Sequence, residues 1–234
     1  MLLLHMAGGG SSVWGPVASR LGTRARVLAP DFPGHGQSLA LDLQPRTQPP
    51  PGISALLWAL TEWTTDFMDA LELGRALLCG HSMGAAVALA TALRAPDRLS
   101  GLGLVCASAQ MAVHPGVLQL LQSDPSAFYA AVTGGPAAPQ PAGRVQPIFP
   151  QAEPAQVLRD FESVDGFDVA AQLAGLRVRT VVVAGGRDVL TTVMDAQRLA
   201  SGIPGAQLCV VEEGGHLLPR QHPAAVAQAL RMLG

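Results

Sequence analysis

The sequence RALLCGHSMGAAVALA (Arg75–Ala90) joins an apolar run to an alanine-rich helical pattern. The run Ala76–Cys79 ends at Gly80, Ser82 follows two residues later, and Gly84 comes two residues after the serine. A residue at a sharp strand-to-helix turn has a strained backbone, which costs on the order of 1–3 kcal/mol. Flanking glycines have no Cβ, so the strand and the helix can approach closely. The stretch therefore predicts a Gly-x-Ser-x-Gly nucleophile elbow that raises the hydroxyl of Ser82 above one end of a sheet.

The alternative is a glycine-padded turn in which Ser82 is passive. Five residues with three fixed positions recur by chance, so the context has to decide between the two interpretations. An apolar run precedes the motif and a helical pattern follows it, which is the context that a nucleophile elbow requires. A serine alcohol is a weak nucleophile without a base and an acid, so a histidine and a carboxylate are expected elsewhere in the chain.

The remaining sequence alternates between predicted strands and predicted helices. Six runs have consecutive apolar residues, as strands covered on both faces do: Leu2–His5, Arg26–Ala29, Ala76–Cys79, Leu102–Cys106, Arg179–Ala184 and Gln207–Val211. Helical periodicity marks the segments between them: Val13–Leu21, Ser54–Leu71, Met83–Arg94, Thr191–Ala200 and Ala224–Leu233. This alternation predicts an α/β fold with a mostly parallel sheet of about six strands and helices on both faces.

Residues 107–168 interrupt this alternation. They contain no convincing strand, and their middle, GGPAAPQPAGRVQPIFP, has too many prolines and glycines for a long helix. Connections of this length in a compact domain are usually functional. We therefore expect residues 1–234 to form a single domain in which residues 107–168 are a small lid insertion. A second proline-rich loop, Leu39–Ser54, ends at Ser54, a predicted helix N-cap.

Composition narrows the possible functions. The chain has 234 residues, 49% hydrophobic and 14% charged, with a formal charge of −2 and neither a basic block nor an acidic tail. Nucleic acid and anionic membranes are therefore not expected partners. The chain has no lysine, which excludes a Schiff-base lysine and a P-loop lysine. A small-molecule substrate is the expected partner, no cofactor is expected, and a homodimer is left open.

The three cysteines, Cys79, Cys106 and Cys209, lie inside apolar segments and are odd in number. This argues against a disulfide framework, and no cysteine has metal-ligand spacing, so no metal site is expected. The amino-terminal MLLLHM is too short for a signal-peptide core, and no apolar run approaches the roughly 20 residues of a membrane span. A cytoplasmic protein is the expectation.

His216 is the candidate base, because it follows the last apolar run and a Gly-Gly turn. Catalytic groups gather beyond the carboxyl ends of parallel strands. The other candidates are interpreted as structural. His81 would point away from its neighbour Ser82, and His222 begins a helix. His114 belongs to the lid and His35 to a turn.

Asp188 is the candidate acid, because it follows the predicted strand Arg179–Ala184. A carboxylate at this position would fix the histidine tautomer and stabilise its cation. The preceding strand end, LVCASAQMA, offers no carboxylate, and Asp165, Asp168 and Asp195 are interpreted as loop or helix-terminus residues. The resulting chain order is serine, aspartate, histidine.

The loop after the first predicted strand, in LLLHMAGGGSSVW, is a candidate oxyanion hole. We expect the backbone N–H groups of Ala7 and Met83 to be its two donors. The alternative is a dinucleotide-binding glycine loop. Gly8 and Gly10 lack the third glycine of that motif, because Val13 occupies its place.

With these residues in place, the chain resembles the α/β-hydrolase superfamily along nearly its whole length. Four blocks carry the resemblance: LLLHMAGGGSSVWGPVASRL, RVLAPDFPGHGQS, LLCGHSMGAAVALA, and VVVAGGRD with EGGHLLPRQHP. The resemblance implies Ser82 as nucleophile, Asp188 as acid, His216 as base, and Ala7 with Met83 as oxyanion donors. It also implies that the first three predicted strands lie at the centre of the sheet.

Two features depart from the family pattern. Most members have a two-stranded hairpin before the LLLH strand, and this chain begins with that strand, so six strands are expected instead of eight. Met6 stands where the family usually has glycine after the histidine, which would narrow the pocket and leaves the N–H of Met6 as an alternative to that of Ala7 in the oxyanion hole.

The expected reaction is cleavage of an ester or thioester of a small, largely apolar acyl group through an acyl-enzyme on Ser82. Alternatives with the same three residues are acyl transfer, lactone hydrolysis, perhydrolysis and C–C bond hydrolysis, and a non-catalytic ligand-binding protein is a further one. Apolar residues of the loop and lid are the candidate acyl pocket: Met6, Val113, Leu118, Leu121, Phe128, Phe149 and Phe161.

Overall fold

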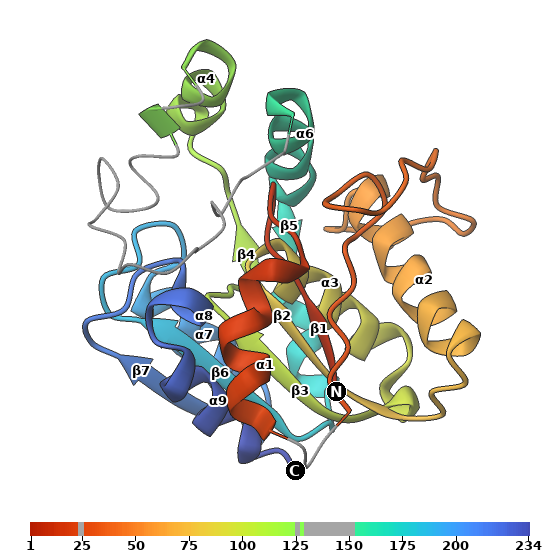
Figure 1. The fold of residues 1–234 in the computed structure, drawn as a ribbon, viewed down its shortest axis with the longest axis vertical. Coiled ribbons are helices and arrows are strands. Elements are labelled where there is room, and N and C mark those ends of the chain that lie inside the picture. The colour runs from red at the N-terminus through yellow and green to blue at the C-terminus, as the bar shows by residue number, and fades with distance from the viewer. Residues whose placement is uncertain (23–25, 125–126, 129–152) are drawn as a thin grey trace.

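A computed structural model describes residues 1–22, 26–124, 127–128 and 153–234. Its main sheet is parallel, with the spatial order β1-β2-β3-β6-β7 (Figure 1). The strands of this sheet are β1 (Leu2–Leu4), β2 (Ala76–His81), β3 (Leu99–Val105), β6 (Thr180–Gly185) and β7 (Gln207–Val211). Side chains of successive strand residues enter two different cores, so the strands are covered on both faces, as their continuous apolar runs predict.

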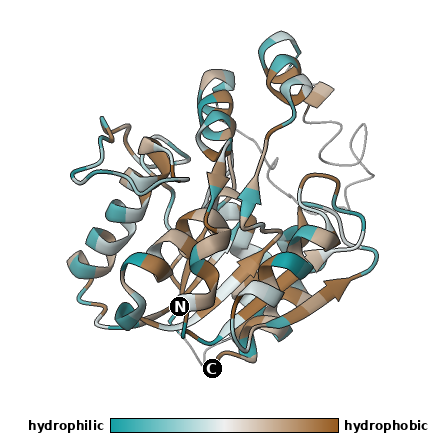
Figure 2. Cartoon of the chain, turned by 180° about the vertical axis from the view of Figure 1, so that it is seen from behind, coloured by the Kyte–Doolittle hydropathy of each residue, from teal (hydrophilic) through white to brown (hydrophobic). Residues whose placement is uncertain are grey.

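Helices form a layer on each face of the sheet. One core contains residues of α2 (Ala55–Ala70), α3 (Met83–Arg94) and α7 (Val193–Gly202). The other contains residues of α1 (Gly15–Leu21), α8 (Leu218–Gln221) and α9 (Pro223–Arg231). In Figure 2 the strands are mostly brown, and teal residues lie on the surrounding helices and loops. Short 3-10 helices complete these layers: Ser11–Trp14, Pro96–Arg98 and Ala170–Gly175.

Helix boundaries follow local signals in the sequence. Ser54 is the N-cap of α2, as predicted, and its Oγ accepts the N–H of Leu57. Thr192 caps α7 in a capping box with Asp195. The predicted helix Met83–Arg94 has the same bounds as α3.

The edge of the sheet differs from the sequence prediction. Residues Arg26–Ala29 do not form a strand and make a single parallel bridge, Leu2 to Leu28. Pro30 follows and has no N–H to extend the ladder. The described residues thus give five strands in the main sheet, and six were expected. The centre of the sheet is β2, β3 and β6, so the implied central position is confirmed for the third predicted strand, which is β2, and is wrong for the first two.

Residues 107–168 are here called the insertion, and its described helices lie beyond the carboxyl end of the sheet (Figure 1). No strand was predicted there, yet β4 (Gln110–Met111) and β5 (Phe167–Asp168) pair antiparallel at its base. Above them lie α4 (Pro115–Ser123) and α6 (Pro154–Val164). Leu121, Phe128 and Val157 form a small apolar core between the two helices. The proline-rich middle of the insertion lies outside the described residues.

Two histidines are completely buried at the carboxyl end of the sheet. His5 follows β1, and its Nδ1 and Nε2 contact the carbonyl of Met6 and the N–H of Phe32. His81 ends β2, and its Nε2 contacts the carbonyl of His216 at 2.7 Å. Burial lowers the pKa of His5 to about 4 and that of His81 to about 3, so both rings are neutral.

Two glycines permit the closest backbone contact in the sheet. A Cβ on Gly80 would lie 2.0 Å from the carbonyl oxygen of Gly84. A Cβ on Gly84 would lie 2.4 Å from the carbonyl oxygen of Leu4 and 2.5 Å from that of His5. Because these neighbours are backbone atoms, a side chain on Gly84 requires α3 to move away from β1, and one on Gly80 requires the end of β2 to move away from the start of α3.

We predict that Gly84→Ala lowers the free energy of unfolding by about 2–3 kcal/mol, because the added methyl group overpacks a rigid backbone contact. Urea denaturation measures this change. Gly175→Ala is the matched control, because a Cβ at that position would have no atom of a non-neighbouring residue within 4 Å. Equal stability of the two variants would contradict the prediction.

Acid should destabilise the fold before most carboxylates protonate. The pKa values of His5 and His81 are below the unfolded value of 6.5, so their contribution is present above pH 6.5 and is lost as the pH falls toward 4. Each ring contributes a slope of about 1.4 kcal/mol per pH unit in that window. Urea midpoints from pH 7 to 4.5 measure it. His81→Gln should make the slope shallower, and an unchanged slope would contradict the assignment.

Candidate functional site

Ser82 lies in a strained turn between β2 and α3. Its φ of +54° and ψ of −117° are in a region that residues other than glycine rarely adopt. Its N–H donates to the carbonyl of Val105 in β3 at 3.0 Å, and its carbonyl accepts the N–H groups of Ala85 and Ala86. Although Ser82 is the N-cap residue of α3, its side chain does not cap the helix. The hydroxyl is therefore available to another partner.

That partner is His216, on the loop after β7. Its Nε2 lies 3.0 Å from Oγ of Ser82, and its Nδ1 lies 2.9 and 3.1 Å from the two carboxylate oxygens of Asp188. A carboxylate only accepts, so Nδ1 carries the proton and Nε2 is the free base that faces the hydroxyl. His216 and Asp188 are only 5% and 6% exposed. The structure thus brings together the three predicted catalytic residues, which come from the ends of three strands.

The carboxylate of Asp188 is fixed by its own loop. It accepts the N–H of Leu190 at 2.8 Å, the N–H of Thr191 at 3.0 Å and the hydroxyl of Thr191 at 2.7 Å. Burial acts to raise the pKa of Asp188, but these hydrogen bonds and the contact with His216 outweigh it and hold the pKa below its usual range. Asp188 is therefore charged at neutral pH, where it can stabilise a histidine cation.

The predicted oxyanion donors lie on the two sides of the close contact between β1 and the elbow. Met83 is the first residue of α3, so its N–H has no acceptor within the helix. In the loop after β1, the N–H of Gly9 donates to Met6, and the N–H of Gly8 donates to Asp160. The N–H of Ala7 belongs to the same peptide as the Met6 carbonyl that accepts from Gly9, and it directly precedes the engaged N–H of Gly8. Both candidate donors are thus backbone groups of segments that pack against each other.

A cavity of about 340 Å³ opens at Ser82 and His216, between the insertion and the loop after β6. Its apolar lining comes from both sides: Met111, Ala112, Val113, Val117, Phe161, Val164, Val189 and Leu190. Polar side chains also reach it: Ser108, Gln110, His114, Thr191 and Asp195. Among the described lining residues there is no arginine and Asp195 is acidic, so the walls disfavour an anionic molecule and suit one with both apolar and polar parts.

Two of the predicted pocket residues, Val113 and Phe161, line this cavity. Met6 is instead part of the buried core that contains Trp14 and Val17 on the α1 side of the sheet, and it is not in the lining of the cavity. The other predicted residues are also elsewhere. Leu121 and Phe128 belong to the apolar core of the insertion, Leu118 is half-buried on α4 outside the lining, and Phe149 lies outside the described residues.

Sequence reasoning missed the polar and rim residues of the cavity. Gln110 and Met111 form β4, whose two-residue length gives no period-2 signal. Val189 and Leu190 directly follow Asp188, so the assignment of the acid could have placed them at the cavity. Val189 is 80% exposed, which is unusual for valine and marks an apolar rim.

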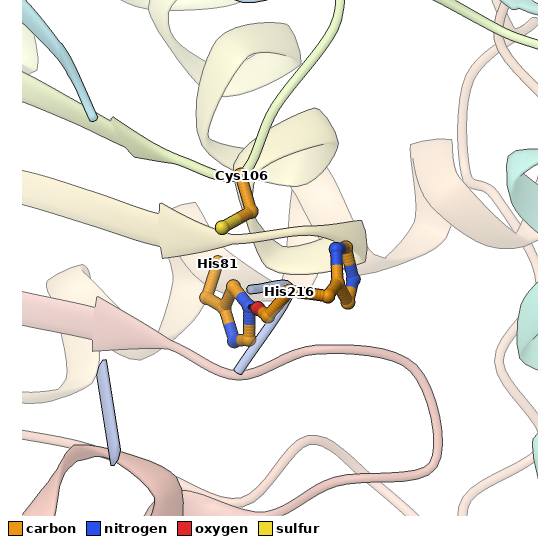
Figure 3. Close-up of side chains that lie close together, drawn as sticks. All are labelled: His81, Cys106 and His216. Atoms are coloured by element: carbon orange, nitrogen blue, oxygen red, sulfur yellow. Dashed lines mark hydrogen bonds between the residues drawn. The ribbon is translucent and has the colours of Figure 1, made fainter. Parts of the chain in front are cut away.

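His81, Cys106 and His216 are the one group in the described chain with metal-ligand spacing, their ligand atoms lying within 4.8 Å of one another (Figure 3). Metal binding needs a thiolate, and burial raises the pKa of Cys106 well above its ordinary value, with the charge of Asp188 adding to this. Both ring nitrogens of His216 have partners in Ser82 and Asp188. The three residues are therefore better placed to hold His216 in position than to bind a cation.

Within the described ranges, no helix combines the length and apolarity that crossing a bilayer requires.

Comparison with known proteins identifies relatives over nearly the whole chain. A carbamate hydrolase RutD of Pseudomonas syringae is 27% identical, over 99% of this chain and 92% of its own. An acetyltransferase component of an acetoin cleaving system from Pseudomonas putida is 30% identical, and this chain spans 62% of its length. The crystal structure of a hydrolase from Pseudomonas aeruginosa PA01 superposes with a TM-score of 0.80 at 28% identity, covering 99% of this chain and 88% of that one.

A thermophilic esterase from Thermogutta terrifontis shares the fold, with a TM-score of 0.78 over 99% of this chain and 87% of the other, at 24% identity. These similarities confirm the predicted fold class, a mostly parallel α/β-hydrolase sheet. The model of the alpha/beta hydrolase family matches residues 1–229, and the chain belongs to this family.

Proposed function

We propose that the protein is a serine hydrolase that cleaves a carboxylic ester or thioester of a small, largely apolar acyl group. The observation that carries the proposal is the continuous contact from Ser82 through His216 to Asp188 at a cavity that both apolar and polar side chains line. Family membership supports hydrolysis in general. The choice of ester comes from the chemistry of these residues, because an alkoxide nucleophile attacks a carbonyl with a good leaving group most readily.

In the proposed first step, Nε2 of His216 takes the proton from Oγ of Ser82 as Oγ attacks the carbonyl carbon. The carbonyl π electrons move to oxygen, and the backbone N–H groups of Ala7 and Met83 stabilise this oxyanion. When the carbon–oxygen or carbon–sulfur bond breaks, the histidine returns its proton to the leaving group. Water, deprotonated by the same histidine, then releases the acid from Ser82.

The insertion takes the role of a lid in this proposal. Val113, Val117 and Phe161 project from it over Ser82 and line the cavity. A cover of this kind excludes water from the oxyanion and strengthens the interactions that stabilise it.

A carbamate is the second candidate substrate, because relatives named carbamate hydrolase cover nearly the full chain. Its carbonyl would occupy the same position relative to Ser82. Parallel assays with matched phenyl esters, thioesters, lactones and carbamates distinguish the candidates. Added alcohols, amines or peroxide reveal any transfer to an acceptor other than water.

Replacement of the nucleophile and of the acid should separate their roles. We expect Ser82→Ala to abolish turnover of p-nitrophenyl butyrate, and Asp188→Asn to lower kcat by roughly 10⁴-fold, because the amide favours the wrong histidine tautomer. Initial rates on folded protein measure both. Glu213→Gln is the matched control, since it removes an exposed carboxylate from the strand end next to His216. Turnover that persists in Ser82→Ala would exclude the proposed nucleophile.

The cavity should set an optimum acyl length. With p-nitrophenyl esters, kcat/KM should rise by up to roughly fourfold per methylene while the chain fills the apolar lining. It should fall once the chain exceeds a volume of about 340 Å³. Val113→Phe, which places a larger side chain in the cavity, should move the optimum to shorter chains. An optimum that stays in place would show that the acyl group binds elsewhere.

A further inference from the structure

A buried carboxylate of the insertion contacts the loop of the proposed oxyanion hole. The N–H of Gly8 donates to Oδ2 of Asp160 in α6 at 2.7 Å, across 152 residues of sequence. Asp160 is completely buried. Val157, one turn earlier on α6, covers the same glycine, because a Cβ on Gly8 would lie 2.8 Å from Cγ2 of Val157. Helix α6 is therefore seated directly on the loop after β1.

The same carboxylate forms a buried pair with His35. Oδ2 of Asp160 lies 2.7 Å from Nε2 of His35, and Nδ1 of His35 lies 3.2 Å from the carbonyl of Pro33. The carboxylate and the carbonyl accept hydrogen bonds, so the doubly protonated cation satisfies both, and the amide nitrogen of Gln156 lies farther from Nε2, at 3.3 Å. Burial acts to lower the pKa of His35, but the hydrogen bond and the charge of Asp160 outweigh it, and the pKa is raised from 6.5. Gln156 completes the group by donating to Oδ1 of Asp160 at 2.8 Å.

Other charged groups around the pair have smaller effects on the pKa of His35. Arg159 on α6 acts to lower the pKa of His35. The ring of His5 lies 4.9 Å from that of His35 and is neutral, because burial lowers its pKa to about 4. Asp31, from the loop that carries His35, accepts the N–H groups of Ser11 and Gln37. Asp160 is the one carboxylate here that contacts the His35 ring.

The two peptide groups that flank Cα of Ala7 are both fixed. The carbonyl of Met6, in the same peptide as the N–H of Ala7, accepts Nδ1–H of His5 at 2.8 Å and the N–H of Gly9 at 3.1 Å. The next peptide is held by Asp160 through the N–H of Gly8. A donor stabilises an oxyanion best when its direction is set before the reaction.

We propose that Asp160 is a positioning residue for the oxyanion hole: from the insertion, through Gly8, it fixes the direction of the Ala7 N–H, and His35 holds it in place. This role rests on the proposed function. It means that the oxyanion hole is complete only when α6 is packed against the loop after β1. An insertion that lifts away removes both the cavity wall and the fixed donor.

Kinetics of two variants test the proposal. Asp160→Ala removes the acceptor of the Gly8 N–H, so kcat for p-nitrophenyl butyrate should fall by about 10- to 100-fold, less than the roughly 10²–10³-fold of losing a donor outright. KM should change by less than about threefold, since the ground-state carbonyl needs the donor little. Asp160→Asn keeps an oxygen acceptor and should recover most of kcat. Glu162→Gln, which removes an exposed carboxylate from the same helix, is the charge-matched control.

The charged pair has a separate signature in the pH dependence of stability. The pKa of folded His35 is raised, so the stability that its charge contributes is complete below pH 6.5 and is lost as the pH rises through the raised value. The difference in Tm between the wild type and Asp160→Asn should therefore shrink from pH 6 to pH 9. The Tm of Glu162→Gln should follow the wild type throughout.

Rates are normalised to folded protein, so a loss that reflects unfolding alone would overturn the positioning role. The role would also be overturned if Asp160→Ala kept its kcat within about threefold while the wild type turned over normally. Failure of the wild type to hydrolyse any ester, thioester, lactone or carbamate is a different result, because it removes the proposed function itself and this role with it.

Discussion

The contact between the carboxyl end of β1 and the start of α3 is the constraint on which the rest of the site depends. Gly80 and Gly84 leave no room for a side chain, since any added Cβ would meet a carbonyl of the elbow or of β1. Because these two glycines have no side chains, Ser82 can keep a backbone conformation that is costly for serine. It also brings the loop with Ala7 beside the first turn of α3. One packing contact therefore positions both the hydroxyl and the backbone groups proposed to stabilise the oxyanion.

The histidines at this end of the sheet differ in charge because their partners differ. His5 and His81 each contact a backbone carbonyl within the core, and burial keeps them neutral. His35 and His216 each contact a buried carboxylate, which can stabilise a positive charge. In His216 the second nitrogen faces Ser82, and in His35 it faces a carbonyl. The same pairing thus gives one histidine placed to exchange a proton with a hydroxyl and one whose protonated form both ring neighbours stabilise.

Much of the fold and of the contact among Ser82, His216 and Asp188 could be predicted because their signals are local. A buried run, two glycines and a helical pattern mark the elbow within sixteen residues, and an acid and a histidine each follow an apolar run. The cavity could not be predicted in the same way. Its walls depend on how α4 and α6 pack, and apolar residues of an insertion fill its own core as readily as they face a substrate, as Leu121 does.

Long-range polar contacts had no sequence signal. His35 was interpreted as a turn residue, and Asp160 was not considered, because its partners Gly8 and His35 are 152 and 125 residues away in the sequence. The pairing of the predicted edge strand with β1 was also overestimated. Arg26–Ala29 has the composition of a strand, but only Leu28 pairs, and Pro30 ends the ladder.

The most direct test of the account is the site of covalent modification by a fluorophosphonate, which reacts only with a serine activated by a neighbouring base. Peptide mass spectrometry of the treated protein should find one phosphonyl group, on the peptide that contains Ser82, and none in the His216→Ala variant. An unmodified wild type, or a phosphonyl group on another residue, would contradict the account.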